Sequence, residues 1–107
     1  MSTGTVQGLP EGLLDDVKIY LDVTWEDEAT EKRITGFILD GMAYLDNKLG
    51  DAGDYVSPGY PRTLLKEYCR YARDAALDVF ENNYQSMILA MQNDRGVQNL
   101  VESYISP

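Results

Sequence analysis

Apolar residues recur at helical spacing along most of the chain, and this periodicity limits the fold more strictly than any other feature of the sequence. A short first helix is predicted just after Pro10, with apolar positions at Leu13, Leu14, Val17 and Leu21. A second, longer helix is predicted from Thr24 to Gly50, with an apolar stripe of Ile34, Ile38, Leu45 and Leu49 and with Met42 close to it. A third helix is predicted over residues 61–94. The chain is therefore expected to be all-α, a small helical bundle of three main helices plus a short amphipathic C-terminal segment.

The same periodicity divides the 107 residues into one helical domain with two less regular ends. Residues 1–8 lack periodicity and are predicted to form a flexible N-terminal arm. The helical domain covers residues 9–94 and contains a loop at 50–61 that is rich in glycine and proline. Gly96 is expected to interrupt the third helix, and residues 95–107 are predicted to be a docking segment, because so short a helix needs a surface on its own bundle or on a partner. Its apolar residues at helical spacing are Val97, Leu100, Val101, Tyr104 and Ile105.

The second predicted helix carries two internal glycines. Thr24 is expected to cap its N-terminus, with Asp27 three residues further on in a capping-box-like position. Gly36 and Gly41 each cost roughly 0.5–1 kcal/mol relative to alanine inside a helix. Either close packing against a neighbouring helix or contact with another subunit explains their presence.

The third predicted helix sorts its charged residues onto two flanks when it is projected at about 100° per residue. The basic flank consists of Arg62, Lys66, Arg70 and Arg73, and the acidic flank of Glu67, Asp74, Asp78 and Glu81. The face expected in the core consists of Leu65, Tyr68, Ala72, Ala75 and Val79. The bases either pair with acids of the first two helices in the same subunit or meet the acidic flank of a neighbouring copy. The second interpretation makes all eight charged residues part of a head-to-tail subunit interface that closes into a ring.

The charge balance limits both the partners and the chemistry of the protein. Eighteen acidic residues stand against nine basic ones, a formal net charge of −9, so tight wrapping on DNA is not expected. The chain has no histidine, the commonest general base and metal ligand, and we predict no enzyme, no catalytic residue, no cofactor and no metal site. The single cysteine, Cys69, is expected to be a packed thiol in a reducing compartment. No apolar run is long enough to predict a membrane span.

The loop at 50–61 is long for a helix connection, and it is interpreted either as a functional loop or as a plain crossover between antiparallel helices. The acidic residues in and before it do not follow the order of a calcium-binding loop. Tyrosine is frequent at protein interfaces, where its ring and its hydroxyl are both used. Tyr55 and Tyr60 are therefore predicted to dock a partner, together with Val97, Leu100 and Tyr104 of the C-terminal segment.

Three segments carry a family resemblance: YLDVTWEDEAT at residues 20–30, GMAYL at 41–45 and LLKEYCRYARDAALDVFENNY at 64–84. With these segments, residues 13–94 resemble the head–tail connector proteins, also called head-completion or adaptor proteins, of long-tailed phages and of prophages in Gram-positive bacteria. The resemblance implies a small helical subunit whose copies form a ring beneath the portal vertex, dodecameric in the virion. It also implies that the ring extends the DNA channel and offers a docking surface to the tail or to a stopper protein.

The partners that the resemblance implies are other copies of the chain, the portal protein, a stopper or tail-completion protein, and double-stranded DNA that passes without specific binding. No membrane partner is expected. The implied location is the head–tail junction of the virion, and the bacterial host cytoplasm during assembly. The surplus of acid suits a channel wall that repels phosphate. The alternative hypothesis is a small acidic binding protein, a DNA mimic or adaptor, that acts as a monomer or dimer.

Overall fold

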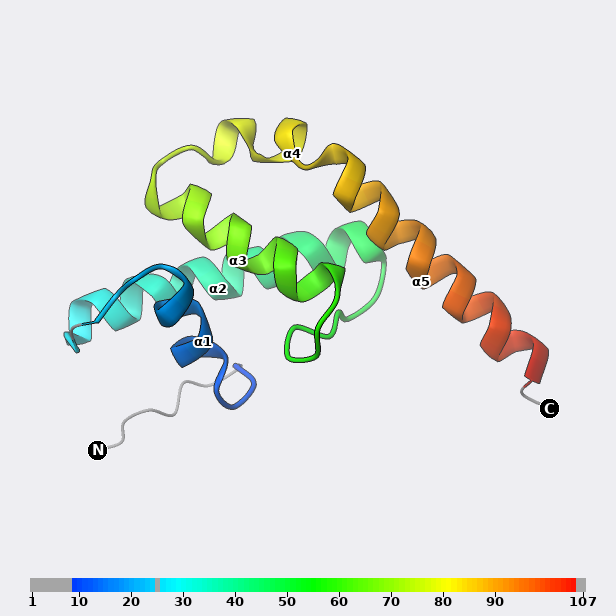
Figure 1. Cartoon of the computed structure of the whole chain (residues 1–107), viewed down its shortest axis with the longest axis horizontal. Helices are drawn as coiled ribbons and strands as arrows, with labels where there is room; N and C mark the ends of the chain where they lie inside the picture. The colour runs from blue at the N-terminus through cyan, green and yellow to red at the C-terminus, as the bar shows by residue number, and fades with distance from the viewer. Residues whose placement is uncertain (1–8, 25, 106–107) are drawn as a thin grey trace.

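The computed structural model of the chain describes residues 9–24 and 26–105, and side chains as far as residue 102. Every regular element within these ranges is helical, which confirms the all-α prediction (Figure 1). The elements are α1 (Leu13–Tyr20), α2 (Glu28–Leu49), α3 (Tyr60–Arg73), the 3-10 turn η1 (Leu77–Val79), α4 (Phe80–Asn83) and α5 (Gln85–Ile105). The predicted arm at residues 1–8 lies outside the described residues.

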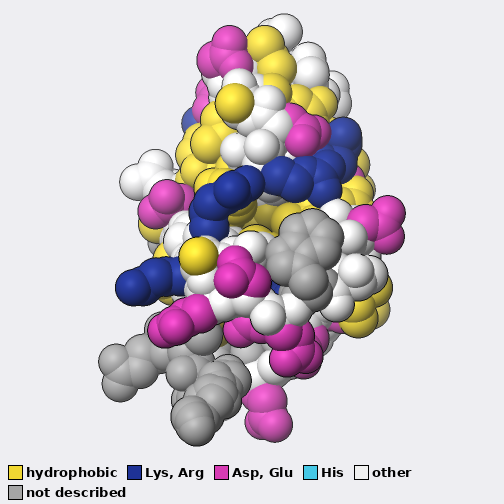
Figure 2. Space-filling model, turned by 90° about the vertical axis from the view of Figure 1, so that its left-hand side faces the viewer, with side chains coloured by type: hydrophobic (Ala, Val, Ile, Leu, Met, Phe, Trp, Pro, Cys, Tyr) yellow, Lys and Arg dark blue, Asp and Glu magenta, His cyan; other side chains and the backbone are white. Residues whose placement is uncertain are grey.

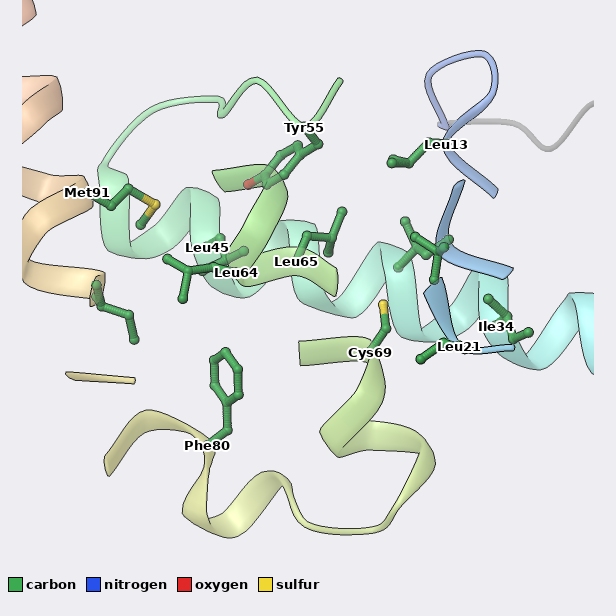
Figure 3. Packing of buried hydrophobic residues seen from close by; sticks show 13 residues of the cluster. Leu13, Leu21, Ile34, Leu45, Tyr55, Leu64, Leu65, Cys69, Phe80 and Met91 are labelled. Carbon is green, nitrogen blue, oxygen red and sulfur yellow. The ribbon is translucent and has the colours of Figure 1, made fainter. Parts of the chain in front are cut away.

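The molecule is elongated, with principal extents of 49 × 33 × 18 Å. Helices α2 and α3 pack side by side at its centre, α1 packs against one end of this pair, and α5 crosses the other end and projects past it (Figure 1). One continuous core joins all five α-helices and the loop before α3 (Figure 3). Its buried residues include the predicted positions Leu13, Val17, Leu21, Ile34, Ile38 and Leu45, so the apolar stripes of the first two predicted helices are confirmed.

Helix α2 begins three residues later than predicted. Asp27, not Thr24, is its N-cap, because the Asp27 carboxylate accepts the Thr30 backbone N–H at 3.1 Å and the Thr30 hydroxyl at 2.9 Å. The predicted stop at Gly50 is confirmed. Gly50 has a left-handed φ of 73°, and its N–H donates to the Asp46 carbonyl at 2.8 Å.

A single third helix over residues 61–94 is not formed, so that prediction is wrong. Helix α3 ends at Arg73, and Ala75 then adopts a left-handed φ of 57°. The Ala76 N–H donates to the Tyr71 carbonyl at 2.8 Å, which is the long hydrogen bond of the Schellman motif that closes many helices. Alanine occupies the left-handed position where glycine is usual, so the sequence gives no signal for this stop.

Because α3 ends at Arg73, the residues that follow it contribute to the core differently from the prediction. Phe80, at the start of α4, is 2% exposed, and its ring centroid lies 5.5 Å from those of Tyr68 and Tyr71 on α3. In Figure 3 the Phe80 ring points from its own segment toward the rest of the cluster. Ala75 and Val79, which were predicted to extend the core face, are exposed. An aromatic side chain that follows the break therefore fills the core in their place.

Helix α5 is continuous from Gln85 to Ile105, so the predicted interruption at Gly96 is wrong. One glycine costs a helix only about 1 kcal/mol and does not by itself end it. The first half of α5 packs on the bundle, where Ile88 and Met91 are buried. Every described side chain from Gly96 onward is exposed, and this half projects from the body (Figure 1).

Candidate interaction surfaces

The basic residues at the start of α3 contact an acid of their own subunit. Arg62 Nη2 lies 3.2 Å from Asp16 Oδ2 of α1, and Lys66 Nζ lies 3.9 Å from the same oxygen. Lys66 Nζ also lies over the Tyr20 ring, 5.7 Å from its centroid. These contacts hold α1 against α3, and they agree with the interpretation in which the bases pair with acids of an earlier helix.

The basic residues at the end of α3 also have partners in their own chain. Arg70 pairs with Glu67, one turn earlier in the same helix. Arg73 Nε donates to Asp74 at 3.1 Å, and Arg73 Nη1 donates to the Leu21 carbonyl at 2.8 Å. All four cations of the predicted basic flank therefore have an acidic partner within their own chain, so a neighbouring copy is not needed to satisfy them. Whether they also meet another subunit stays a prediction.

The predicted acidic flank is not one surface. Because α3 ends at Arg73, Asp74, Asp78 and Glu81 lie beyond the helix that was expected to align them. On α4, Glu81 accepts a 2.6 Å hydrogen bond from the Tyr44 hydroxyl and lies 3.0 Å from Lys48 Nζ. These two contacts lower the pKa of the Glu81 carboxyl and tie α4 to α2. Two opposed flanks on one helix are therefore not formed.

The five predicted docking residues occupy different environments. Tyr55 is 2% exposed, and its hydroxyl donates to a carboxylate of α2, so its assignment to a docking surface is wrong (Figure 3). Burial raises the pKa of this hydroxyl. Tyr60, at the start of α3, is half-exposed, and Val97 and Leu100 are exposed on the projecting half of α5. The side chain of Tyr104 lies outside the described residues.

Helix α5 is apolar on two opposite sides. Its inner side packs on the bundle through Met87, Ile88 and Met91. About half a revolution away, at roughly 100° per residue, lie Leu89, Val97, Leu100 and Val101, which we call the α5 outer face. These four side chains are 52%, 60%, 63% and 49% exposed. A surface helix normally buries one stripe, so a second apolar side indicates a second partner.

A second uncovered strip runs along the solvent side of α2. Its residues, spaced four or three apart on one side of the helix, are Lys32, Gly36, Leu39 and Ala43, which we call the α2 stripe. A Cβ atom at Gly36 would meet nothing within 4 Å, whereas one at Gly41 would lie 2.7 Å from Leu65 Cδ1. Packing against α3 thus explains Gly41 but not Gly36. For Gly36 the other explanation, contact with another subunit, stays a prediction.

The α2 stripe also adjoins the basic residues that lack an acidic partner. Seven of the nine Lys and Arg residues form ion pairs within the chain. In the described part of the chain, Lys32 and Arg33 have no acidic group within 4.0 Å, and Arg33 lies over the Phe37 ring at 5.6 Å. Sequence reasoning chose the regularly spaced cations of α3 and missed these two. The sequence does contain a signal for these two residues: Gly36 follows them by one turn, on the polar side of the helix.

The loop before α3 is fastened to α5 rather than left free. Arg95 Nη1 donates to Asp51 at 3.0 Å, and its Nη2 donates to the Ala52 carbonyl at 3.3 Å. Asp54 accepts the backbone N–H groups of the two residues Val56 and Ser57 and thereby forms a tight turn. A hollow of about 170 Å³ remains between this loop and α5. The loop is thus a structured connection that links α2, α3 and α5.

In the described part of the chain, the side chains that serve as nucleophiles or metal ligands in other proteins are either buried or far apart. Cys69 is fully buried, as predicted, and burial raises the pKa of its thiol to about 12. In residues 9–24 and 26–105 no three His, Cys, Asp or Glu side chains gather closely enough to hold a metal ion. None of the helices in the same ranges combines the length and the apolar character needed to cross a membrane.

Comparisons of the chain with protein-family models, with curated proteins and with solved structures gave no match.

Proposed function

We propose that the protein is a structural virion subunit, a ring-forming head–tail connector that docks below the portal and extends the DNA channel. The α5 outer face carries this proposal. It is apolar, it projects from the bundle, and no described part of the chain covers it. The resemblance of residues 13–94 to connector proteins supplies the partners of the proposed subunit: other copies of the chain, the portal protein, and a tail or stopper protein.

The distribution of charge supports a role as a channel wall. The formal net charge is −9, and most basic residues are already paired with acids of the same chain. On the end of the molecule shown in Figure 2, Lys and Arg side chains form a band across the middle, and Asp and Glu side chains gather below it. A surface with surplus acid repels phosphate, so double-stranded DNA passes without specific binding. In this proposal the ring is dodecameric and lies at the head–tail junction.

Electron microscopy of the purified chain mixed with the portal protein of the same phage or prophage tests the proposal. We expect an added ring, with a central hole, on the axis of the portal. Replacing Val97 and Leu100 by aspartate puts charge on the α5 outer face and should abolish the added ring. The matched control is Asn99→Asp, which adds a charge to the same half of α5 away from the outer face.

Portal particles that look the same with and without the chain would contradict the proposal. A chain that then stays monomeric at high concentration would leave the alternative hypothesis, a small acidic binding protein. A ring that survives the double substitution would show that assembly of the ring does not use the α5 outer face.

A further inference from the structure

We infer that the α2 stripe of one copy receives the α5 outer face of a second copy of the chain. The inference rests on the proposed ring-forming function and names the two surfaces that join neighbouring subunits. Both surfaces are helical, both lie open to solvent, and both contain features that their own chain does not explain. These features are a second apolar side on α5, and the unfilled space at Gly36 beside two unpaired cations on α2.

The contact cannot form within one chain. In Figure 1 α2 begins at one end of the long axis, and the projecting half of α5 ends at the other. Where the two helices do meet, the contact lies at the far end of α2, as the 2.9 Å hydrogen bond from Gln92 Nε2 to the Lys48 carbonyl shows. The outer face also points away from the bundle. Only another molecule, placed head to tail, can bring these two surfaces together.

The shapes of the two surfaces are complementary. Gly36 and Ala43 make the α2 stripe low on either side of Leu39, which is 40% exposed. The α5 outer face presents larger side chains, Val97 and Leu100 among them. Small residues let the backbones of two helices approach closely, so the large side chains of one helix fit between the turns of the other. A close approach also accounts for a glycine at a position where alanine has room in the isolated subunit.

The charges fix the register of the contact. Asp94 lies at the edge of the α5 outer face and has no basic partner among the described residues, and Lys32 and Arg33 have no acidic one. With the two helices parallel, placing Val97 beside Gly36 and Leu100 beside Leu39 brings Asp94 within one residue rise of Lys32, which belongs to the α2 stripe. From Lys32 to Ala43 and from Asp94 to Ile105, each helix offers a contact length of about 16 Å.

Disulfide trapping tests the register. Leu39→Cys and Leu100→Cys variants are mixed and mildly oxidised at a concentration at which electron microscopy shows assembly of the wild-type chain on its portal. We expect a cross-linked dimer in the mixture and none in either variant alone. The native Cys69 does not interfere because it is fully buried. The control mixture pairs Leu100→Cys with Asp78→Cys, a position exposed on η1, and should give no cross-link.

Charge reversal supplies an independent readout. Lys32→Glu with Arg33→Glu should weaken association by about tenfold, and adding Asp94→Lys should restore most of the loss. Assembly without the 39–100 cross-link and without this rescue overturns the inference and leaves the proposed function standing. No assembly of the wild-type chain, alone or on the portal, overturns both.

Discussion

Gly36 and Gly41 lie in the same helix, and replacing each by alanine is expected to change stability in opposite directions. A Cβ at position 36 meets nothing within 4 Å, but one at 41 would lie 2.7 Å from Leu65 Cδ1 and 2.8 Å from Tyr68 Cδ1. Both substitutions gain helix stability, because glycine loses more backbone entropy than alanine when a helix forms. Only Gly41→Ala must also displace packed side chains.

The size of each effect follows from these surroundings. At Gly36 the gain in helix propensity is not opposed by any steric clash, so Gly36→Ala should raise the free energy of unfolding by about 0.5–1 kcal/mol. At Gly41 the neighbours cannot move easily: Leu65 is fully buried, and the Tyr68 ring is held by two aromatic rings at 5.5 and 5.6 Å. Overpacking of a core costs about 1–3 kcal/mol, which exceeds the propensity gain, so Gly41→Ala should lose roughly 0.5–2 kcal/mol.

Urea and thermal unfolding followed by circular dichroism measure both changes, at a protein concentration low enough to keep the chain monomeric. For a domain of this size, 1 kcal/mol corresponds to about 4–8 °C in Tm. The two variants should therefore melt on opposite sides of the wild type. Equal shifts of the same sign would refute the reasoning, because they would mean that the space around the two positions does not differ.

Three further outcomes are expected. The Cys69 thiol, buried and with its pKa raised to about 12, should not react with a thiol reagent until the protein is unfolded, and rapid labelling of the native protein would contradict its burial. Tyr55→Phe removes the hydroxyl that donates to Asp46 and should lower the free energy of unfolding by about 1–3 kcal/mol in urea titrations; an unchanged midpoint would mean that this contact is not stabilising. The contacts that lower the pKa of Glu81 stabilise the fold above the ordinary carboxyl pKa of 4.5, and this contribution is lost as the pH falls through the lowered pKa. Glu81→Gln should therefore flatten the fall in Tm between about pH 6 and about pH 3, and an unaltered slope would contradict the assignment.

Helical periodicity was sufficient for the first two helices because each buries one side against the same core. It failed for residues 61–94, where the stop depends on Ala75 in a left-handed conformation. That conformation is stabilised by hydrogen bonds of the helix end, which a residue type does not reveal when it is not glycine. It also failed at Gly96, because packing of the first half of α5 outweighs the small cost of one glycine.

The charged residues were harder to assign than the core. Arg62 and Asp16 are far apart in the sequence, and only the packing of α1 on α3 brings them within 3.2 Å. Spacing along one helix therefore identified cations that are already paired. Gly36 marks the place of Lys32 and Arg33 in the sequence, but their lack of an acidic partner depends on the fold, which pairs the other seven cations.

In the proposed function, copies of the chain join head to tail in a closed ring. Native mass spectrometry of the chain assembled on its portal measures this most directly. We expect one discrete species in which many copies of the 12.0 kDa subunit are added to the portal, and the Lys32→Glu, Arg33→Glu variant should need about tenfold more protein to form it. A portal that gains no subunits, or a chain that forms only a dimer under every condition, would contradict the claim.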